Sequence, residues 1–286
     1  MGDIGVPPID PIPPPNPIME EATGVGRRCL WVVAILMLLS SLVFYVLAGR
    51  VPAQKRLFHS LISLVTTVSF LSYFVMAMGY GLSYSHYTYH KGHKHSPDTY
   101  LDTYREVYWI RYVNWMLTTP LILTCLTFLS GLNGASLLVS ISASLIMFSA
   151  ALGSAYMRQH QQWAWYTIAC LAYLTIVYQI GYQGRRASQA KDQQARNFYS
   201  SIAIFSLAVM LIYPIIWAIS NNARKMSIDA EIIVYAILDI LLQAGFGYWL
   251  VVSHDKIKSI MVSLDGFWAN GASGEGNIRV GENEDV

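Results

Sequence analysis

Seven long apolar runs constrain this chain more than any other feature of its sequence. A membrane-spanning helix needs about 20 apolar residues, and helices are the only form such runs take where no water satisfies the backbone. The runs cover residues 30–48, 57–82, 107–126, 135–155, 163–182, 198–219 and 232–252. The sequence therefore predicts an all-α membrane protein, a bundle of seven transmembrane helices.

Composition supports this class and argues against several functions. The chain is 54% hydrophobic and only 13% charged, which is too apolar for an ordinary soluble domain. Its net charge of +2 includes no concentrated basic tract, so a nucleic-acid partner is not expected. No nucleophile–base pair, phosphate loop or helical metal-ligand cluster stands out, so the sequence does not predict an enzyme. The three cysteines (Cys29, Cys125 and Cys170) read as buried small side chains.

The ends of the chain differ in composition from the seven-run region. Residues 1–26 contain PPIDPIPPPNP and no apolar run, which predicts a disordered, solvated tail. The segment lacks the basic start and apolar centre of a cleaved signal peptide, so the first span is expected to direct insertion. Residues 27–262 then form the membrane domain, and the acidic residues 263–286 a cytoplasmic tail.

The orientation of the bundle follows weakly from its basic residues. One side of the membrane receives ten Lys and Arg, counting the tail after the last span, and the other side receives eight. Because cytoplasmic loops carry the excess of basic residues, this predicts an extracellular N-terminus and a cytoplasmic C-terminus.

The longest connection, residues 83–103, carries four histidines: His86, His90, His93 and His95. Imidazoles at this density can hold a metal or titrate near neutral pH. The alternative is a solvated, flexible loop, which the sequence favours. We therefore predict no metal site and keep these histidines as the weak candidates.

Polar residues interrupt two of the runs. Asp239 and Gln243 lie four apart in the last run, on one face of a helix, where a carboxylate at membrane depth marks a functional-site candidate. In the third run Arg111, Asn114 and Thr118 form a second stripe, which we expect to face the interior. The alternative is a packing helix whose arginine reaches out to the interface.

Several motifs carry a family resemblance. RYVNWMLTTPLIL (111–123) resembles the third helix of microbial rhodopsins, whose pattern is R-Y-x-D-W-x-x-T-T-P. IYPIIW, LDILLQAGFG and MGYGLS resemble the sixth, seventh and second helices of that family in the right order, and DGFWANG near the end resembles fungal members. The resemblance covers residues 27–262 and implies the microbial rhodopsin fold.

The resemblance also implies a chromophore-type pocket and a polar network. The pocket positions match Trp115, Met147, Trp165, Tyr213, Pro214 and Trp217. In the network, Tyr73 and Tyr213 match the tyrosines that hydrogen-bond the helix-7 carboxylate, here Asp239. Arg111 matches the buried arginine and is expected to neutralise Asp239, and Glu231 matches an extracellular proton-release glutamate.

Four positions depart from the family pattern. The retinal-bearing lysine position is Gln243, whose amide cannot form an imine, and no other lysine lies in the seven runs. The counterion position is Asn114, which takes up no proton at physiological pH, and the internal proton-donor position is Cys125, a poor relay when buried. A pocket tryptophan position is Met210. Covalent retinal is therefore not expected.

The sequence thus predicts a non-photoactive, opsin-related protein of a fungal plasma membrane. The family implies a stress-response, scaffold or proton-pump-modulating role, with the bilayer, the proton ATPase or a second copy as partners. One alternative is a sensor that binds retinal, another isoprenoid or a sterol noncovalently, although the same aromatic residues also pack as a collapsed core. A channel or proton transporter is the weakest alternative, because Asp239 alone remains to titrate.

Overall fold

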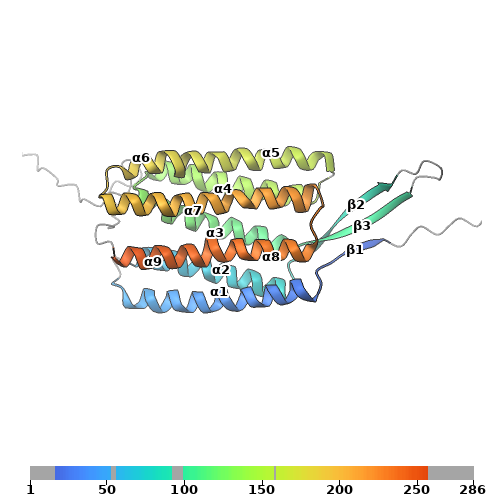
Figure 1. Ribbon diagram of the computed structural model, residues 1–286, viewed down its shortest axis with the longest axis horizontal. Coiled ribbons are helices and arrows are strands. Elements are labelled where there is room, and N and C mark those ends of the chain that lie inside the picture. Colours follow the sequence, from blue (N-terminus) through green and yellow to red (C-terminus); the bar gives the residue numbers. More distant parts are fainter. Residues whose placement is uncertain (1–16, 53–55, 92–98, 158, 257–286) are drawn as a thin grey trace, which may run out of the picture.

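Seven membrane-length helices lie side by side in the computed structural model, which describes residues 17–52, 56–91, 99–157 and 159–256. This confirms the predicted seven-helix bundle. A small β-sheet extends beyond one end of the bundle, and the ends of α6 and α9 lie at the other (Figure 1).

The first four spans are uninterrupted α-helices. Their bounds are α1 (Gly24–Arg50), α2 (Leu57–Ala77), α3 (Trp109–Ser130) and α4 (Gly134–Ala155). The last three each contain a π-helical segment. Span 5 comprises α5 (Gln159–Ile176), the π segment Val177–Gln183 and α6 (Gly184–Ser188). Span 6 comprises α7 (Gln193–Trp217) and the π segment Ala218–Asn222. Span 7 comprises α8 (Ile228–Asp239), the π segment Ile240–Gly245 and α9 (Phe246–Lys256).

Local sequence sets the turn between α3 and α4. Gly131 adopts a left-handed conformation (φ 84°) and its N–H bonds to the carbonyl of Thr127, so α3 ends there. The side chain of Asn133 then accepts a hydrogen bond from the Ser136 N–H and starts α4. A tight connection of this kind places consecutive spans next to each other.

The connection at residues 83–103 was predicted as a loop and instead forms most of a three-stranded sheet. Strands β2 (Ser83–Lys91) and β3 (Thr99–Val107) pair antiparallel, and β1 (Ile18–Glu20) pairs parallel with the other edge of β3. The tyrosines and threonines that alternate along this stretch favour strands, a signal that the loop prediction passed over.

The predicted tail also ends earlier than residue 26. β1 joins the sheet, α1 begins at Gly24, and the Ala22 N–H donates to Glu106 Oε2 at 2.6 Å. Residues 1–16 and the predicted C-terminal tail, 263–286, lie outside the described residues.

The third and seventh spans are the most buried of the bundle. Apolar side chains cover the outer faces of the other helices, for example Leu36 and Leu39 on α1 and Leu171 and Leu174 on α5. The two buried spans also carry the predicted polar stripes, so these stripes meet in the centre of the molecule.

Candidate functional site

Asp239 is the centre of the interior polar site. Its carboxylate is fully buried and accepts hydrogen bonds from the hydroxyls of Tyr73 (2.6 Å) and Tyr213 (2.7 Å). The indole N–H of Trp115 donates to it as well, at 2.8 Å. The two tyrosine bonds are those that the family resemblance implied. The tryptophan bond was not predicted, since Trp115 had been assigned only to the pocket wall.

Gln243 lies one turn beyond Asp239, in the π-helical segment of span 7. Its side chain is buried, with Nε2 at 3.4 Å from Thr118 Oγ1 and 3.5 Å from Asp239 Oδ1. At these distances both contacts are weak hydrogen bonds. The stripes on α3 and span 7 therefore meet as predicted, through Thr118.

Arg111 does not pair with Asp239, contrary to the prediction. It is buried and its Nη1 contacts Glu231 Oε1 at 3.0 Å, while its guanidinium also lies over the rings of Tyr235 (5.0 Å) and Tyr108 (5.5 Å). Glu231 starts span 7 two turns before Asp239, and so is closer to the end of α3 that carries Arg111. The arginine thus neutralises the outer of the two carboxylates.

A second arginine that sequence reasoning did not single out completes this ion pair. Arg105, in β3, contacts Glu231 Oε2 at 2.8 Å through Nη2 and Glu20 Oε2 at 2.8 Å through Nη1. Burial opposes the charged form of Arg105, but the carboxylates of Glu231 and Glu20 outweigh it and raise its pKa. The chain Glu20–Arg105–Glu231–Arg111 joins β1, β3, α8 and α3.

Asn114 and Cys125 are both buried, and neither side chain takes part in the hydrogen-bond network around Asp239. The Asn114 amide is fully buried and its nitrogen and oxygen have no hydrogen-bond partner within the described part of the chain, although its backbone carbonyl accepts from Thr118. Cys125 is fully buried among apolar side chains of the main core.

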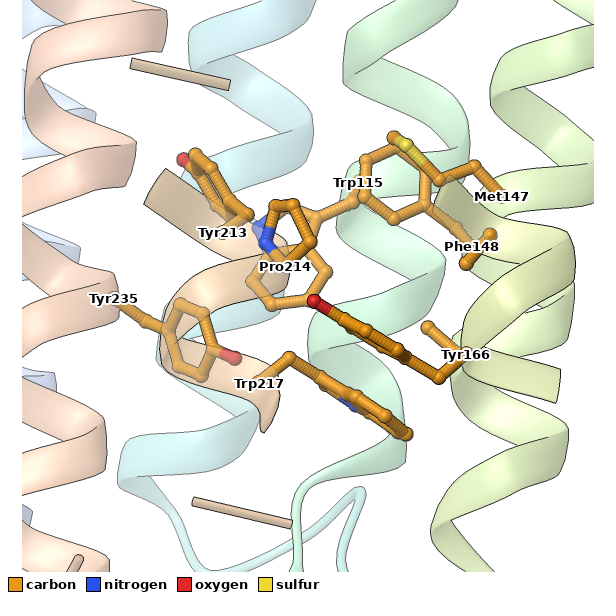
Figure 2. A pocket seen from close by; sticks show the side chains of 10 residues that line it. Trp115, Met147, Phe148, Tyr166, Tyr213, Pro214, Trp217 and Tyr235 are labelled. Carbon is orange, nitrogen blue, oxygen red and sulfur yellow. The ribbon is translucent and has the colours of Figure 1, made fainter. Parts of the chain in front are cut away.

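Aromatic side chains enclose a small cavity between α3, α4, α5, α7 and α8 (Figure 2). Its volume is about 30 Å³, room for roughly one water molecule. The ring of Tyr166 stacks on Trp217 at 5.6 Å and 5° and closes one side. The lining residues are Trp115, Met147, Phe148, Ala151, Tyr166, Ala169, Tyr213, Pro214, Trp217 and Tyr235.

One predicted pocket residue is misplaced. Trp165 is 36% exposed and does not line the cavity, whereas its neighbour Tyr166 does. One residue along a helix is a rotation of about 100°, so the prediction chose the wrong face of span 5.

A second cavity lies beside Gln243 and measures only about 10 Å³. It shares four lining residues with the first cavity, namely Trp115, Met147, Phe148 and Tyr213. Met210, the residue at the predicted tryptophan position, lines this second cavity. The two spaces together are far smaller than the roughly 300–1,000 Å³ of a typical ligand pocket.

The histidine-bearing connection offers no metal site within the residues that the structure describes, where no three His, Cys, Asp or Glu side chains converge. His86 instead contacts the Asp102 carboxylate at 3.1 Å on the exposed face of the hairpin. His93 and His95 lie outside the described residues, as does the side chain of His90.

Comparisons with known proteins agree with this architecture. Residues 27–257 match the family described as bacteriorhodopsin-like protein. The chain is 41% identical to Opsin-1 of Neurospora crassa, over 94% of this chain and 90% of the other. It is 26% identical to bacteriorhodopsin of Halobacterium salinarum, over 82% and 87%. Among solved structures it resembles the light-driven proton pump LR (Mac) of Leptosphaeria maculans, with 40% identity, a TM-score of 0.82, and coverage of 84% of this chain and 98% of that one.

Proposed function

The chain belongs to the bacteriorhodopsin-like protein family, and we propose that within this family it is a member without photochemistry, one that forms no Schiff base with retinal. The observation that carries the proposal is Gln243. It follows the tyrosine-bound Asp239 by one turn in span 7, where the family pattern places the lysine.

Amine chemistry supports this reading. An imine forms from a nucleophilic amine and an aldehyde, and the lone pair of an amide nitrogen is delocalised into its carbonyl. The one lysine in the seven spans is Lys256, the last residue of α9 and thirteen residues beyond Gln243, so no other side chain in the spans supplies the missing amine beside Asp239. The Nε2 group of Gln243 serves as a hydrogen-bond donor toward Thr118 and Asp239 instead.

The cavities weigh against noncovalent binding in the same place. Cavities of about 30 and 10 Å³ are lined in common by Trp115, Met147, Phe148 and Tyr213, and a polyene or sterol would have to displace these side chains. Tight packing of this kind favours the collapsed core over the isoprenoid or sterol sensor.

The charges weigh against proton transport. Glu231 is held by two arginines, and the position of a helix-3 acceptor is the amide of Asn114. Asp239 accepts three short hydrogen bonds and a weak fourth one from Gln243, and among the described residues its hydrogen-bonding partners include no ionisable group other than the tyrosines. A proton path needs a succession of titrating groups, and Asn114 and Cys125 do not supply one.

In the cell we propose a plasma-membrane protein with an extracellular N-terminus that acts in a stress response, as a scaffold or as a modulator of the proton ATPase. This role rests on the family resemblance alone. It is tested by reconstituting the ATPase with and without this protein and measuring proton pumping. An unchanged rate, equal to that with an unrelated seven-helix protein, would remove the modulator role.

The Schiff-base proposal is tested with all-trans retinal. The purified protein is incubated with retinal, reduced with borohydride and weighed by mass spectrometry, with a retinal-binding rhodopsin that keeps the lysine treated in parallel. We expect no retinyl adduct and no visible absorption band in the unmodified protein. An adduct or a band in that protein would overturn the proposal. An adduct in the lysine-bearing rhodopsin shows that the conditions are sufficient, which makes the negative result decisive.

A double variant, Gln243→Lys with Asn114→Asp, tests the closed cavity. We expect it to fold and to stay colourless with retinal, because the aromatic side chains fill the space of the chromophore. A visible pigment would show that these side chains move aside, and it would revive the noncovalent sensor.

A further inference from the structure

The outer face of span 5 carries an aromatic pair near the end of the bundle opposite the sheet. Tyr178 and Tyr182 are 50% and 60% exposed, and their rings stack at 5.6 Å and 17°. The amide of Gln183 donates to the Tyr178 hydroxyl at 3.2 Å. Tyrosines exposed near the end of a span lie at the boundary between hydrocarbon and headgroups.

Two exposed arginines follow this pair within one turn. Arg185 and Arg186 lie three and four residues after Tyr182, which places their backbone about 5–6 Å farther along the helix. They therefore lie at the depth of the lipid phosphates. No carboxylate in the described part of the chain forms an ion pair with either guanidinium.

The surroundings of these arginines are basic. Residues 177–197 hold four basic side chains, Arg185, Arg186, Lys191 and Arg196, against one acid, Asp192. Burial lowers the pKa of Lys191, which lies 3.5 Å from the carbonyl of Phe128. Basic residues next to a membrane helix attract anionic lipid, and the partly buried Lys191 contributes least of these four.

The opposite end of the bundle offers a matched contrast. Arg27 and Arg28 are also adjacent and exposed, and Trp31, 40% exposed, follows within one turn. There, however, six acids accompany six Lys and Arg among the described residues, whereas two acids accompany seven at the other end. Aromatic and arginine residues thus occur at both ends, but acids balance them only at the sheet end.

We propose that the surface formed by Tyr178, Tyr182, Arg185 and Arg186 binds the headgroup of an anionic phospholipid. The two guanidiniums contact its phosphate, which suits their bidentate geometry, and the stacked tyrosines contact the glycerol and upper acyl chains. The alternative is a solvated basic surface that attracts lipid by charge alone. In that case the tyrosine pair would not contribute to binding.

The test uses the full-length protein in nanodiscs of phosphatidylcholine, titrated with phosphatidylserine carrying a fluorescent label. The variants are Arg185→Gln with Arg186→Gln, the matched pair Arg27→Gln with Arg28→Gln, and Tyr178→Leu with Tyr182→Leu. Each basic residue near an anionic surface contributes about 1 kcal/mol, or roughly fivefold in affinity. We expect a loss of about thirtyfold for the first variant and less than about threefold for the Arg27 and Arg28 pair.

Two arms separate lipid from free phosphate and from nonspecific charge. Soluble glycerophosphoserine should compete weakly, and the Tyr178 and Tyr182 variant should weaken lipid binding severalfold. Equal losses from both arginine pairs would show diffuse charge attraction and overturn the proposal. So would full competition by the soluble headgroup, or an unaffected tyrosine variant. Unchanged thermal unfolding midpoints in phosphatidylcholine alone show that the variants are folded.

Discussion

Asp239 shows how one buried carboxylate can remain stable without a directly bound cation. Three neutral donors, the hydroxyls of Tyr73 and Tyr213 and the indole of Trp115, approach its two oxygens from α2, α7 and α3. Hydrogen bonds to a charged group are stronger than neutral ones, and these three tie three helices to span 7. At this scale Asp239 is a structural centre, whatever function its position serves elsewhere in the family.

Replacing Asp239 by Asn should therefore destabilise the bundle. The amide nitrogen that replaces one oxygen is itself a donor, so the facing tyrosine hydroxyl must turn to accept, and the remaining hydrogen bonds lose the charge of the carboxylate. We expect a loss of about 2 kcal/mol, seen as a lower unfolding midpoint in detergent. Asp192→Asn is the matched control, because Asp192 is exposed and makes no capping hydrogen bond. Equal midpoints for the two variants would contradict this account.

Site residues could be predicted where their positions depend on spacing within one helix. Contacts that depend on how two helices are aligned could not. The Arg111–Asn114–Thr118 stripe follows from helical spacing, and the two tyrosines of Asp239 from the resemblance. The pairing of Arg111 with Glu231 depends on the vertical register of α3 against span 7, which spacing within a helix does not specify. The same limit explains why Arg105, in a strand, escaped notice.

At the scale of elements, the sheet and its ion pairs close the end of the bundle from which α1 starts. Arg105 is 4% exposed and joins Glu20 of β1 to Glu231 of α8, and its Nη2 also donates to the carbonyl of Met226 at 3.1 Å. β1 is three residues long and would not persist alone, so these contacts hold it to β3.

Arg105 should contribute more to stability than its partly exposed partner Glu20. Arg105→Met leaves buried Glu231 with one cation, and we expect a loss of about 3 kcal/mol in thermal unfolding. Glu20→Gln removes a partner whose side chain is 34% exposed, and solvent screening should keep the loss under about 1 kcal/mol. A larger effect from Glu20 than from Arg105 would be inconsistent with this ranking.

The sheet should also loosen at high pH. Burial and a hydrogen bond to Glu20 raise the pKa of Tyr87 above its ordinary value of 10.0. The folded state thus holds this proton more tightly than the unfolded chain, so the contribution is complete below about pH 10 and is lost as pH rises through the folded pKa. Limited proteolysis of the N-terminal segment should accelerate as the pH rises above about 10. Tyr87→Phe should make cleavage faster at pH 9 and its rise with pH less steep.

For the molecule as a whole, the two ends differ in charge. Within the described residues and leaving Arg111 aside, the end with α6 carries seven Lys and Arg against two acids, and the sheet end carries six against six. The basic residues alone are nearly equal in number, which is why sequence counting gave a weak signal. The acids of the sheet, above all those bound to Arg105, create the difference.

Because acidic residues contribute little to the orientation of membrane proteins, the proposed orientation, with the sheet outside and α6 in the cytoplasm, rests on the small excess of basic residues at the α6 end. An epitope at the N-terminus should bind antibody on intact cells, and one at the C-terminus only after permeabilisation. The reverse pattern would invert the orientation. The whole-molecule fold itself was the most predictable level, because seven apolar runs allow little else, whereas the pairing of β1 with β3 joins segments about 85 residues apart.

The start of the first span depends on the last. Asp229, in the first turn of α8, accepts hydrogen bonds from the backbone of Thr23 at 2.9 Å and Gly26 at 3.2 Å, and from the Thr23 hydroxyl. During synthesis α1 enters the membrane long before residue 229 leaves the ribosome. The first turn of α1 therefore gains its hydrogen bonds to Asp229 only after most of the chain has been made. Assembly is therefore complete only once span 7 is in place. A chain truncated before span 7 lacks the central carboxylate of Asp239 and also Asp229, which binds the start of α1.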